Sequence, residues 1–206
     1  MRIIVTLLMV LGLSSLSWAD YDEGVEYELL TKAQPAPTDG TVEVIEFFSY
    51  GCPHCYRFEP YVNNWLAKKS DNIKLVQVPA IFNKNWEALA TLYYASEVLG
   101  IQDKMHPAIF EAMHGNGKKI HSFDDLKGLF AQHGVSAEKL EQALNSFTVA
   151  AKTRRAKTMT QSYGIKSVPN VVVQGKYMTN GTLAESHANV FKVVDYLAVE
   201  IEKEKQ

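Results

Sequence analysis

The sequence predicts an α/β fold in which one mixed β-sheet is interrupted by an inserted all-helical domain. Residues 42–49 and 72–80 are apolar, β-branched runs of strand length, and a helical pattern lies between them. From residue 81 to about 163 the pattern is helical throughout, and residues 169–178 then suit a hairpin that leads into a last helix. A strand–helix–strand start and a hairpin–helix end can complete one sheet, with the helices between them as the insertion.

The amino terminus predicts export. Arg2 precedes a short apolar run, and the small residues Ser17 and Ala19 follow it, which is the layout of a cleavable signal peptide. We expect cleavage after Ala19, and an uncleaved membrane anchor is the alternative. No other segment could cross a membrane. The expected parts of the chain are a signal peptide at residues 1–19, the first part of the sheet domain at 20–80, the inserted helical domain at 81–150 and the second part of the sheet domain at 151–206.

Each element has its own local signal. Residues 26–30 suit a short strand, and the Pro- and Gly-rich residues 31–40 connect it to the strand at 42–49. That strand is apolar almost throughout, which is typical of a strand buried on both faces. Gly51 ends it, and Pro53 suits the first position of a helix. The apolar face of this helix consists of Phe58, Val62, Trp65 and Leu66.

The remaining elements follow from periodicity and capping residues. The expected helices of the insertion and the one after it cover about residues 86–100, 103–115, 122–134, 136–147 and 148–163. Their N-caps and C-terminal stops are Ser122, Ser136, Gly100, Gly115 and Gly134. The hairpin turns at Gln174 and Gly175. We expect residues 152–157 and the side chains of His106, His114 and His121 on helix surfaces, and Trp65 and Trp86 in packing roles.

Composition excludes some functions. The 206 residues are 47% hydrophobic and 21% charged, as in a globular protein with a substantial core. The formal net charge of −2 gives no reason to expect nucleic acid as a partner. The two cysteines, Cys52 and Cys55, are separated only by Pro53 and His54. Exported proteins meet oxidising conditions, so this pair decides the chemistry.

A metal site and a structural disulfide are both poor explanations of this pair. Zinc needs four ligands, and the sequence has no second Cys pair and no tightly spaced His pair. A disulfide that closes so short a loop adds only roughly 2 kcal/mol in the chain-entropy model. A redox pair fits better, because Cys52 stands where a strand delivers it to a helix start and the helix dipole favours a thiolate.

The helix start also gives the redox pair a direction. A stabilised Cys52 thiolate favours the reduced form and makes the disulfide a stronger oxidant. Cys55, one turn further along, would be the shielded resolving thiol. His54, if protonated, adds positive charge beside Cys52, and the alternative is a solvent-exposed side chain without effect.

The segments "EFFSYGCPHCYRFEP" and "YGIKSVPNVVVQGKY", the helical insertion and the signal peptide resemble the DsbA family of thioredoxin-fold thiol oxidases. The resemblance covers essentially the whole mature chain and implies a thioredoxin-like sheet. It also implies that Val168-Pro169 is a cis-proline loop facing the cysteines, with the backbone of Val168 free to pair with a substrate segment. The alternative is an ordinary trans proline that opens an edge strand.

Glu46 stands in the apolar strand six residues before Cys52. The resemblance implies that this acid lies beneath the disulfide with a raised pKa and moves protons to and from Cys55. The alternative is a strand end wet enough to hold a carboxylate. Many thioredoxin folds pair this acid with a lysine on the neighbouring strand, but Gln77 occupies that position, and we expect the nearby Lys74 to face the other way.

The resulting expectation is a periplasmic thiol:disulfide oxidase that introduces disulfides into newly exported proteins. The resemblance implies reoxidation by a quinone-linked membrane oxidase of the DsbB type, and we expect a monomer that needs no cofactor and no metal. A disulfide isomerase or reductase of the same fold is one alternative, although no segment is free to be the added dimerisation domain of such isomerases. A peptide-binding chaperone with a vestigial disulfide is the other.

Overall fold

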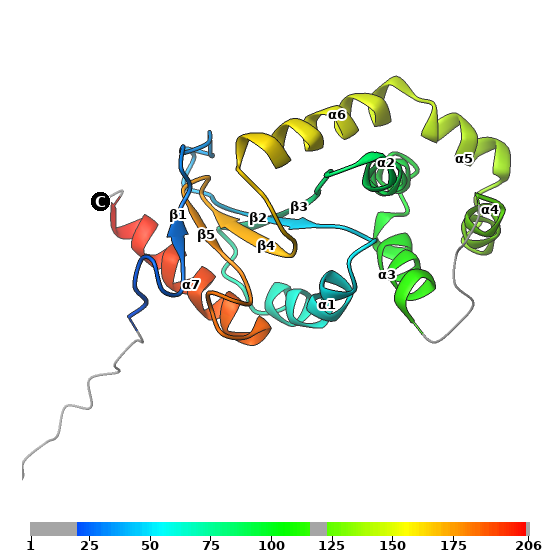
Figure 1. Cartoon of the computed structure of the whole chain (residues 1–206). Coiled ribbons are helices and arrows are strands. Elements are labelled where there is room, and N and C mark those ends of the chain that lie inside the picture. The colour runs from blue at the N-terminus through cyan, green and yellow to red at the C-terminus, as the bar shows by residue number, and fades with distance from the viewer. Residues whose placement is uncertain (1–19, 116–122, 205–206) are drawn as a thin grey trace, which may run out of the picture.

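The computed structural model describes residues 20–115 and 123–204. The expected signal peptide at residues 1–19, the side chain of His121 and the expected N-cap Ser122 lie outside the described residues. The described residues form five strands and seven helices around one mixed sheet (Figure 1). The sheet order is β1-β5-β4-β2-β3. The fold class predicted from the sequence is therefore confirmed.

The central strand β2 (Val42–Phe48) organises the sheet. It pairs in parallel with β3 (Ile73–Pro79) and antiparallel with β4 (Asn170–Val173). Strand β5 (Tyr177–Thr179) joins β4, and β1 (Glu28–Leu29) closes the far edge against β5. Because β2 is flanked on both sides and covered on both faces, nearly all its side chains are buried, as its apolar sequence predicts.

The hairpin between β4 and β5 turns at the expected residues. Gln174 and Gly175 both have positive φ angles, 50° and 61°, as a two-residue turn of the I′ type requires. A side chain on Gly175 would also collide with the backbone carbonyl of Gln34, so the position needs glycine for space as well as for conformation. The predicted hairpin is therefore confirmed.

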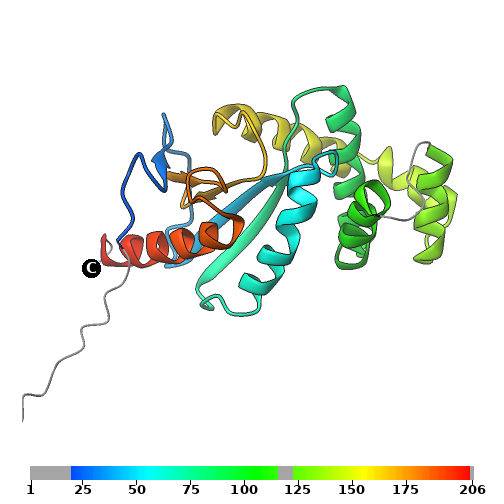
Figure 2. The ribbon, with the colours of Figure 1, turned by 60° about the horizontal axis from the view of Figure 1, so that its bottom comes forward.

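Helices cover the two faces of the sheet differently. Helices α1 (Pro53–Leu66) and α7 (His187–Glu204) pack together on one face, below the sheet in Figure 1. The other helices extend from the opposite side and beyond one end, as the turned view in Figure 2 shows. They are α2 (Lys84–Val98), α3 (Gln102–His114), α4 (Phe123–Gln132), α5 (Ala137–Leu144) and α6 (Phe147–Ser162). The observed ends agree with the expected ones within about three residues.

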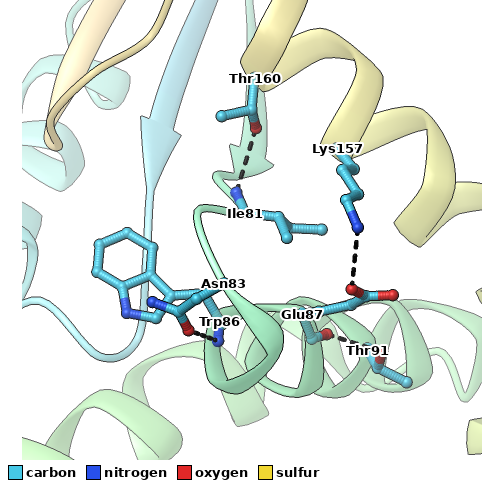
Figure 3. A network of polar contacts seen from close by, with 7 residues as sticks. All are labelled: Ile81, Asn83, Trp86, Glu87, Thr91, Lys157 and Thr160. Atoms are coloured by element: carbon cyan, nitrogen blue, oxygen red, sulfur yellow. Dashed lines mark hydrogen bonds and ion pairs between the residues drawn. The ribbon is translucent and has the colours of Figure 1, made fainter.

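A polar network attaches α6 to the connection between β3 and α2 (Figure 3). The Ile81 N–H donates to Thr160 Oγ1 over 3.2 Å, and Lys157 Nζ lies 3.4 Å from Glu87 Oε2. Lys152 makes a similar contact with Glu97 at 2.7 Å. The expectation of a solvated face at residues 152–157 is right only in part, because Thr153 and Ala156 are buried and the two lysines link α6 to α2.

Among the described residues, no helix is long and apolar enough to cross a membrane.

Candidate active site

Cys52 is the N-cap of α1, with extended backbone angles (φ −102°, ψ 113°), and Pro53 begins the helix. Its own N–H donates to the Ser49 carbonyl over 3.0 Å, which closes the turn between β2 and α1. The two cysteines are not bonded to each other, so the structure shows the dithiol form. This is the strand-to-helix placement that the sequence predicts.

The environment of Cys52 favours a thiolate. The pKa of this thiol is lowered from 9.0 to about 5, chiefly because the Cys55 thiol donates a hydrogen bond to it. The backbone N–H groups of Cys55 and His54 lower the pKa further, and partial burial opposes them. Cys52 is therefore the group that can attack a disulfide, or leave one, as an anion.

Cys55 lies only three residues further along and has the opposite character. It is fully buried, and its pKa is strongly raised, first by burial and then by the neighbouring Cys52. The Ser49 backbone lowers this pKa in part, and the negative charge of Glu46 is the weakest of the causes that raise it. Cys55 consequently holds its proton in the dithiol form, as a shielded thiol would.

His54 affects the cysteines less than expected. Its side chain is exposed, and the Arg57 guanidinium donates to its Nδ1 over 3.1 Å. Its charge is the weakest of the causes that lower the pKa of Cys52, and its backbone N–H contributes more. The position of His54 at the helix start matters more than its imidazole.

The Val168-Pro169 peptide bond is cis, as the resemblance implies. The Cys52 thiol lies 3.5 Å from the Val168 carbonyl oxygen, so the loop faces the cysteines across the fold. Two hollows flank this place and share His187. One is lined chiefly by Tyr56, Arg57, Tyr61, Pro107 and Phe110, and the other by Val168, Pro169, Asn180 and Leu183.

Glu46 lies in a buried position, with 1% of its surface exposed. Gln77 Nε2 donates to its Oε2 over 2.8 Å, while its Oε1 has no hydrogen-bond partner among the described residues. Its pKa is raised to about 8, first by burial and then by the charge of Glu59, and the Gln77 hydrogen bond lowers it only in part. A solvated strand end is therefore ruled out, and Gln77 is the hydrogen-bond partner.

Lys74 does not replace the missing cation. In the register of β2 and β3, Glu46 stands beside Gln77 and Glu43 stands beside Lys74. Successive side chains of a strand alternate between faces, so Lys74 points away from Glu46. The pKa of Glu43 is raised by burial, and the charges of Arg155 and then Lys74 lower it only in part, so Lys74 acts on Glu43 rather than on Glu46.

Two functional candidates escaped the sequence reasoning: Glu59 on α1 and His106 on α3. His106 was expected on a helix surface, but it is 8% exposed, and its Nε2 lies 3.2 Å from Glu59 Oε1. Both had a signal in the sequence. Glu59 follows Cys55 by four residues and so shares its helix face, and His106 belongs to the apolar stripe of α3, which consists of Met105, His106, Ile109 and Phe110.

The other expectations for single residues have mixed outcomes. His114 is half-buried, and its Nε2 lies 2.7 Å from the Tyr50 carbonyl oxygen, so it is not a free surface residue. Trp65 is a packing residue, since its ring stacks on Phe191. Trp86 contacts the ring of Phe82, and a side chain at Gly51 would meet it, so it also supports the turn before Cys52.

Known proteins resemble this chain over most of its length. Residues 72–187 match the family model of the DSBA-like thioredoxin domain. The thiol:disulfide interchange protein DsbA of Azotobacter vinelandii is 38% identical over 93% of this chain and 88% of its own length. The protein of the same name from Burkholderia cepacia is 37% identical over 99% of both chains.

Solved structures agree with the sequence relatives. The crystal structure of Pseudomonas aeruginosa DsbA superposes with a TM-score of 0.82 and 33% identity, over 90% of this chain and 96% of that one. The matched family model begins after the cysteine pair, but the relatives and the superposed structure extend over most of the chain. The chain therefore belongs to the DsbA family of thioredoxin-fold thiol:disulfide oxidoreductases.

Proposed function

We propose that this thiol:disulfide oxidoreductase acts as an oxidase that transfers the Cys52–Cys55 disulfide to newly exported proteins. A substrate thiolate attacks Cys52 Sγ, the bond between the two cysteine sulfurs breaks, and Cys55 leaves as a thiolate that takes up a proton. The second substrate thiolate then attacks the substrate sulfur of the mixed disulfide, and Cys52 leaves as a thiolate. The substrate loses two electrons and the cysteine pair gains two.

One observation carries the direction of this transfer: the pKa of Cys52 is lowered to about 5. Stabilising this thiolate stabilises the reduced protein relative to the disulfide, which raises the reduction potential. A low pKa also makes Cys52 the better leaving group in the second step. Both effects favour donation of the disulfide over its acceptance.

Glu46 supplies the proton that Cys55 needs. With its pKa raised to about 8, the Glu46 carboxyl is largely protonated near neutral pH and can give a proton to the Cys55 thiolate formed in the first step. An electrostatic effect of Glu46 on Cys55 supports this role, since a charge on Glu46 raises the pKa of Cys55. When the pair is reoxidised, the proton returns from Cys55 to Glu46.

The loop at Val168 and Pro169 holds the substrate. The Val168 carbonyl oxygen lies 3.5 Å from the Cys52 thiol, so an extended peptide that pairs with the backbone of Val168 lies beside the reacting sulfur. The two hollows that share His187 offer space for its side chains. The same surface suits a quinone-linked membrane oxidase of the DsbB type, which would reoxidise the pair.

The cell compartment and the assembly belong to the same proposal. We assign residues 1–19 to a cleaved signal peptide, and the mature protein to the periplasm, where oxidising conditions let a disulfide donor be recharged. The mature protein acts as a monomer and needs no cofactor beyond its own cysteines. The domain boundaries at 80/81 and 150/151 are part of this proposal, and the second of them falls within α6.

The redox equilibrium of the purified protein with glutathione tests the direction. We expect a potential well above that of thioredoxin, because the Cys52 thiolate is stabilised. A potential as reducing as that of thioredoxin would favour the reductase or isomerase alternative. Normal maturation of exported substrates in cells that carry Cys52→Ser would favour the chaperone alternative.

A further inference from the structure

We propose that His106, from the inserted helices, is a positioning residue for the redox reaction: its imidazole takes up a proton from solvent when the Glu46 carboxyl gives one to Cys55. The protonated imidazole balances the charge of the buried carboxyl group of Glu46 and of the largely buried carboxyl group of Glu59. This inference rests on the proposed proton transfer from Glu46. It gives the inserted helices a part in the chemistry of the cysteines.

The geometry places these groups in one buried cluster. His106 Nε2 lies 3.2 Å from Glu59 Oε1 and 3.4 Å from Gln77 Nε2. The same Gln77 nitrogen donates to Glu46 Oε2 over 2.8 Å, so the amide lies between the carboxyl group and the imidazole. The four side chains come from β2, β3, α1 and α3.

Two carboxyl oxygens in this cluster still need a donor. Glu46 Oε1 and Glu59 Oε1 are buried without a hydrogen-bond partner among the described residues. Glu59 Oε1 is within ion-pair distance of His106 Nε2, but the two are not aligned as a hydrogen bond. A protonated Nε2 donates, so it would turn to Glu59 Oε1 and give up its contact with the Gln77 amide nitrogen, which can only donate. A buried carboxylate without a cation is costly, and a protonated His106 is the cation that the position allows.

The other side of the imidazole fits both charge states. His106 Nδ1 lies 3.0 Å from the Tyr50 hydroxyl. That hydroxyl can donate to a neutral Nδ1 and can accept from a protonated one, because its hydrogen rotates. An imidazole changes charge near neutral pH more readily than any other side chain, so this contact suits a group that gains and loses a proton.

The remaining neighbours of His106 leave it as the group that balances the charge. Besides Glu59 from α1 and Tyr50 from the turn after β2, the titratable group facing it is Tyr93 from α2, with ring centroids 5.9 Å apart. The pKa values of both tyrosines are raised, chiefly by burial, so they stay neutral at physiological pH. The other rings packed against His106 belong to Phe48 and Phe110 and are apolar.

Nuclear magnetic resonance tests the proposal on the wild-type protein without any variant. The two imidazole nitrogens of His106, labelled with ¹⁵N, report its charge in the oxidised and the reduced protein across pH 5 to 9. We expect His106 to bind its proton at a higher pH in the redox form in which Glu46 is ionised. An identical titration in both forms and in Glu46→Gln would overturn the proposal.

A matched pair of variants adds a second readout. His106→Gln keeps a polar donor but cannot be protonated, and His133→Gln makes the same change in the turn after α4. We expect the apparent pKa of the Glu46 carboxyl, followed by its ¹³C signal, to rise by about one unit or more in His106→Gln only. In the double variant His106→Gln/Gln77→Lys a new cation beside Glu46 should bring that pKa back down. An unchanged pKa in His106→Gln would contradict the proposal.

The outcomes separate this inference from the proposed function. If the wild-type protein does not donate its disulfide to a reduced peptide, the oxidase function is refuted, whatever the resonances of His106 show. Normal donation together with a His106 charge that ignores the redox state would refute only the role of His106.

Discussion

The two cysteines stand three residues apart at the start of α1, yet their surroundings shift the pKa values of the two thiols in opposite directions. At Cys52, a thiol and backbone N–H groups point at the sulfur, and its pKa falls to about 5. At Cys55, burial and the neighbouring negative charges raise the pKa. The comparison teaches that a redox pair can obtain its asymmetry from its surroundings, since Cys52 stands at the helix start and accepts a hydrogen bond from Cys55, which is itself buried in the interior.

The strongest test of the different roles of the two cysteines is to remove each sulfur in turn. Cys52→Ser should abolish disulfide transfer to a reduced two-cysteine peptide, because no nucleophile or leaving group remains at the helix start. Cys55→Ser should instead trap the substrate as a mixed disulfide at Cys52 when the variant is offered an oxidised substrate. Mass spectrometry of the trapped species checks both. Equal behaviour of the two variants would contradict the assignment of roles.

We expect the next largest effect from Glu46→Gln, because Glu46 is the buried acid whose charge acts on Cys55. The pKa of Glu46 is about 8 in the folded protein and about 4.5 when unfolded, so the unfolded chain loses its proton first. Stability should fall as pH rises from 4.5 to 8 and then level off, and Glu46→Gln should remove this loss. At pH 7, Glu46→Gln should therefore have a free energy of unfolding about 3 kcal/mol higher than the wild type, because each pH unit above the unfolded pKa costs about 1.36 kcal/mol.

Denaturant unfolding of the reduced protein at several pH values measures that gain. Glu43→Gln is a matched control on the same strand, because Glu43 faces away from Glu46 and is only partly buried. A constant difference between wild type and Glu46→Gln across pH 4 to 9 would show that Glu46 has an ordinary pKa.

Cys52 predicts a smaller effect of opposite sign. The Cys52 thiolate stabilises the reduced protein, fully above its unfolded pKa of 9.0 and no longer once the pH falls through about 5. The free energy of unfolding of the reduced wild-type protein should exceed that of Cys52→Ser by about 2 kcal/mol at pH 7, after allowance for solvent screening. Titration of the ultraviolet absorbance of the thiolate gives the pKa of Cys52 directly, and a midpoint near 9 would refute the helix-start effect.

The smallest predicted effect concerns the partner of Glu46. Gln77→Leu keeps the volume but removes the hydrogen bond to Oε2, which holds down the pKa of Glu46. We expect that pKa to rise by about one unit, since hydrogen bonds to charged groups contribute on the order of 1.5 kcal/mol. Carboxyl ¹³C titration measures it, and a fall in the pKa would mean that Gln77 does not stabilise the carboxylate.

Much of the fold and part of the site could be predicted from local patterns. The strand at Val42–Phe48 is apolar apart from its two glutamates, and the turn at Gln174 and Gly175 is set by two adjacent residues, so each signal lies within a few positions. Cys52, Pro53 and Cys55 share one helix start, and the spacing of Glu46 from them lies along one strand. For such residues, sequence distance and spatial distance are closely related.

The contacts of Glu59 and His106 could not be predicted in the same way. They depend on how α3 packs against α1, and periodicity alone does not say which helix faces which. Histidine and glutamate also suit helix surfaces, so their burial contradicts their usual preference. The register of β2 and β3 was equally needed to decide that Gln77, and not Lys74, stands beside Glu46.

Helix α3 has a consequence for protein engineering. Its residues His106 and Phe110 pack in the same aromatic cluster as Phe48 and Tyr50, which belong to the central strand and the turn after it. The helical segment is therefore not a module that can be cut out or exchanged for one from a relative. A graft of residues 84–146 that does not restore these side chains would leave an unfilled space beside Phe48 and Tyr50, and Glu59 without its contact to His106.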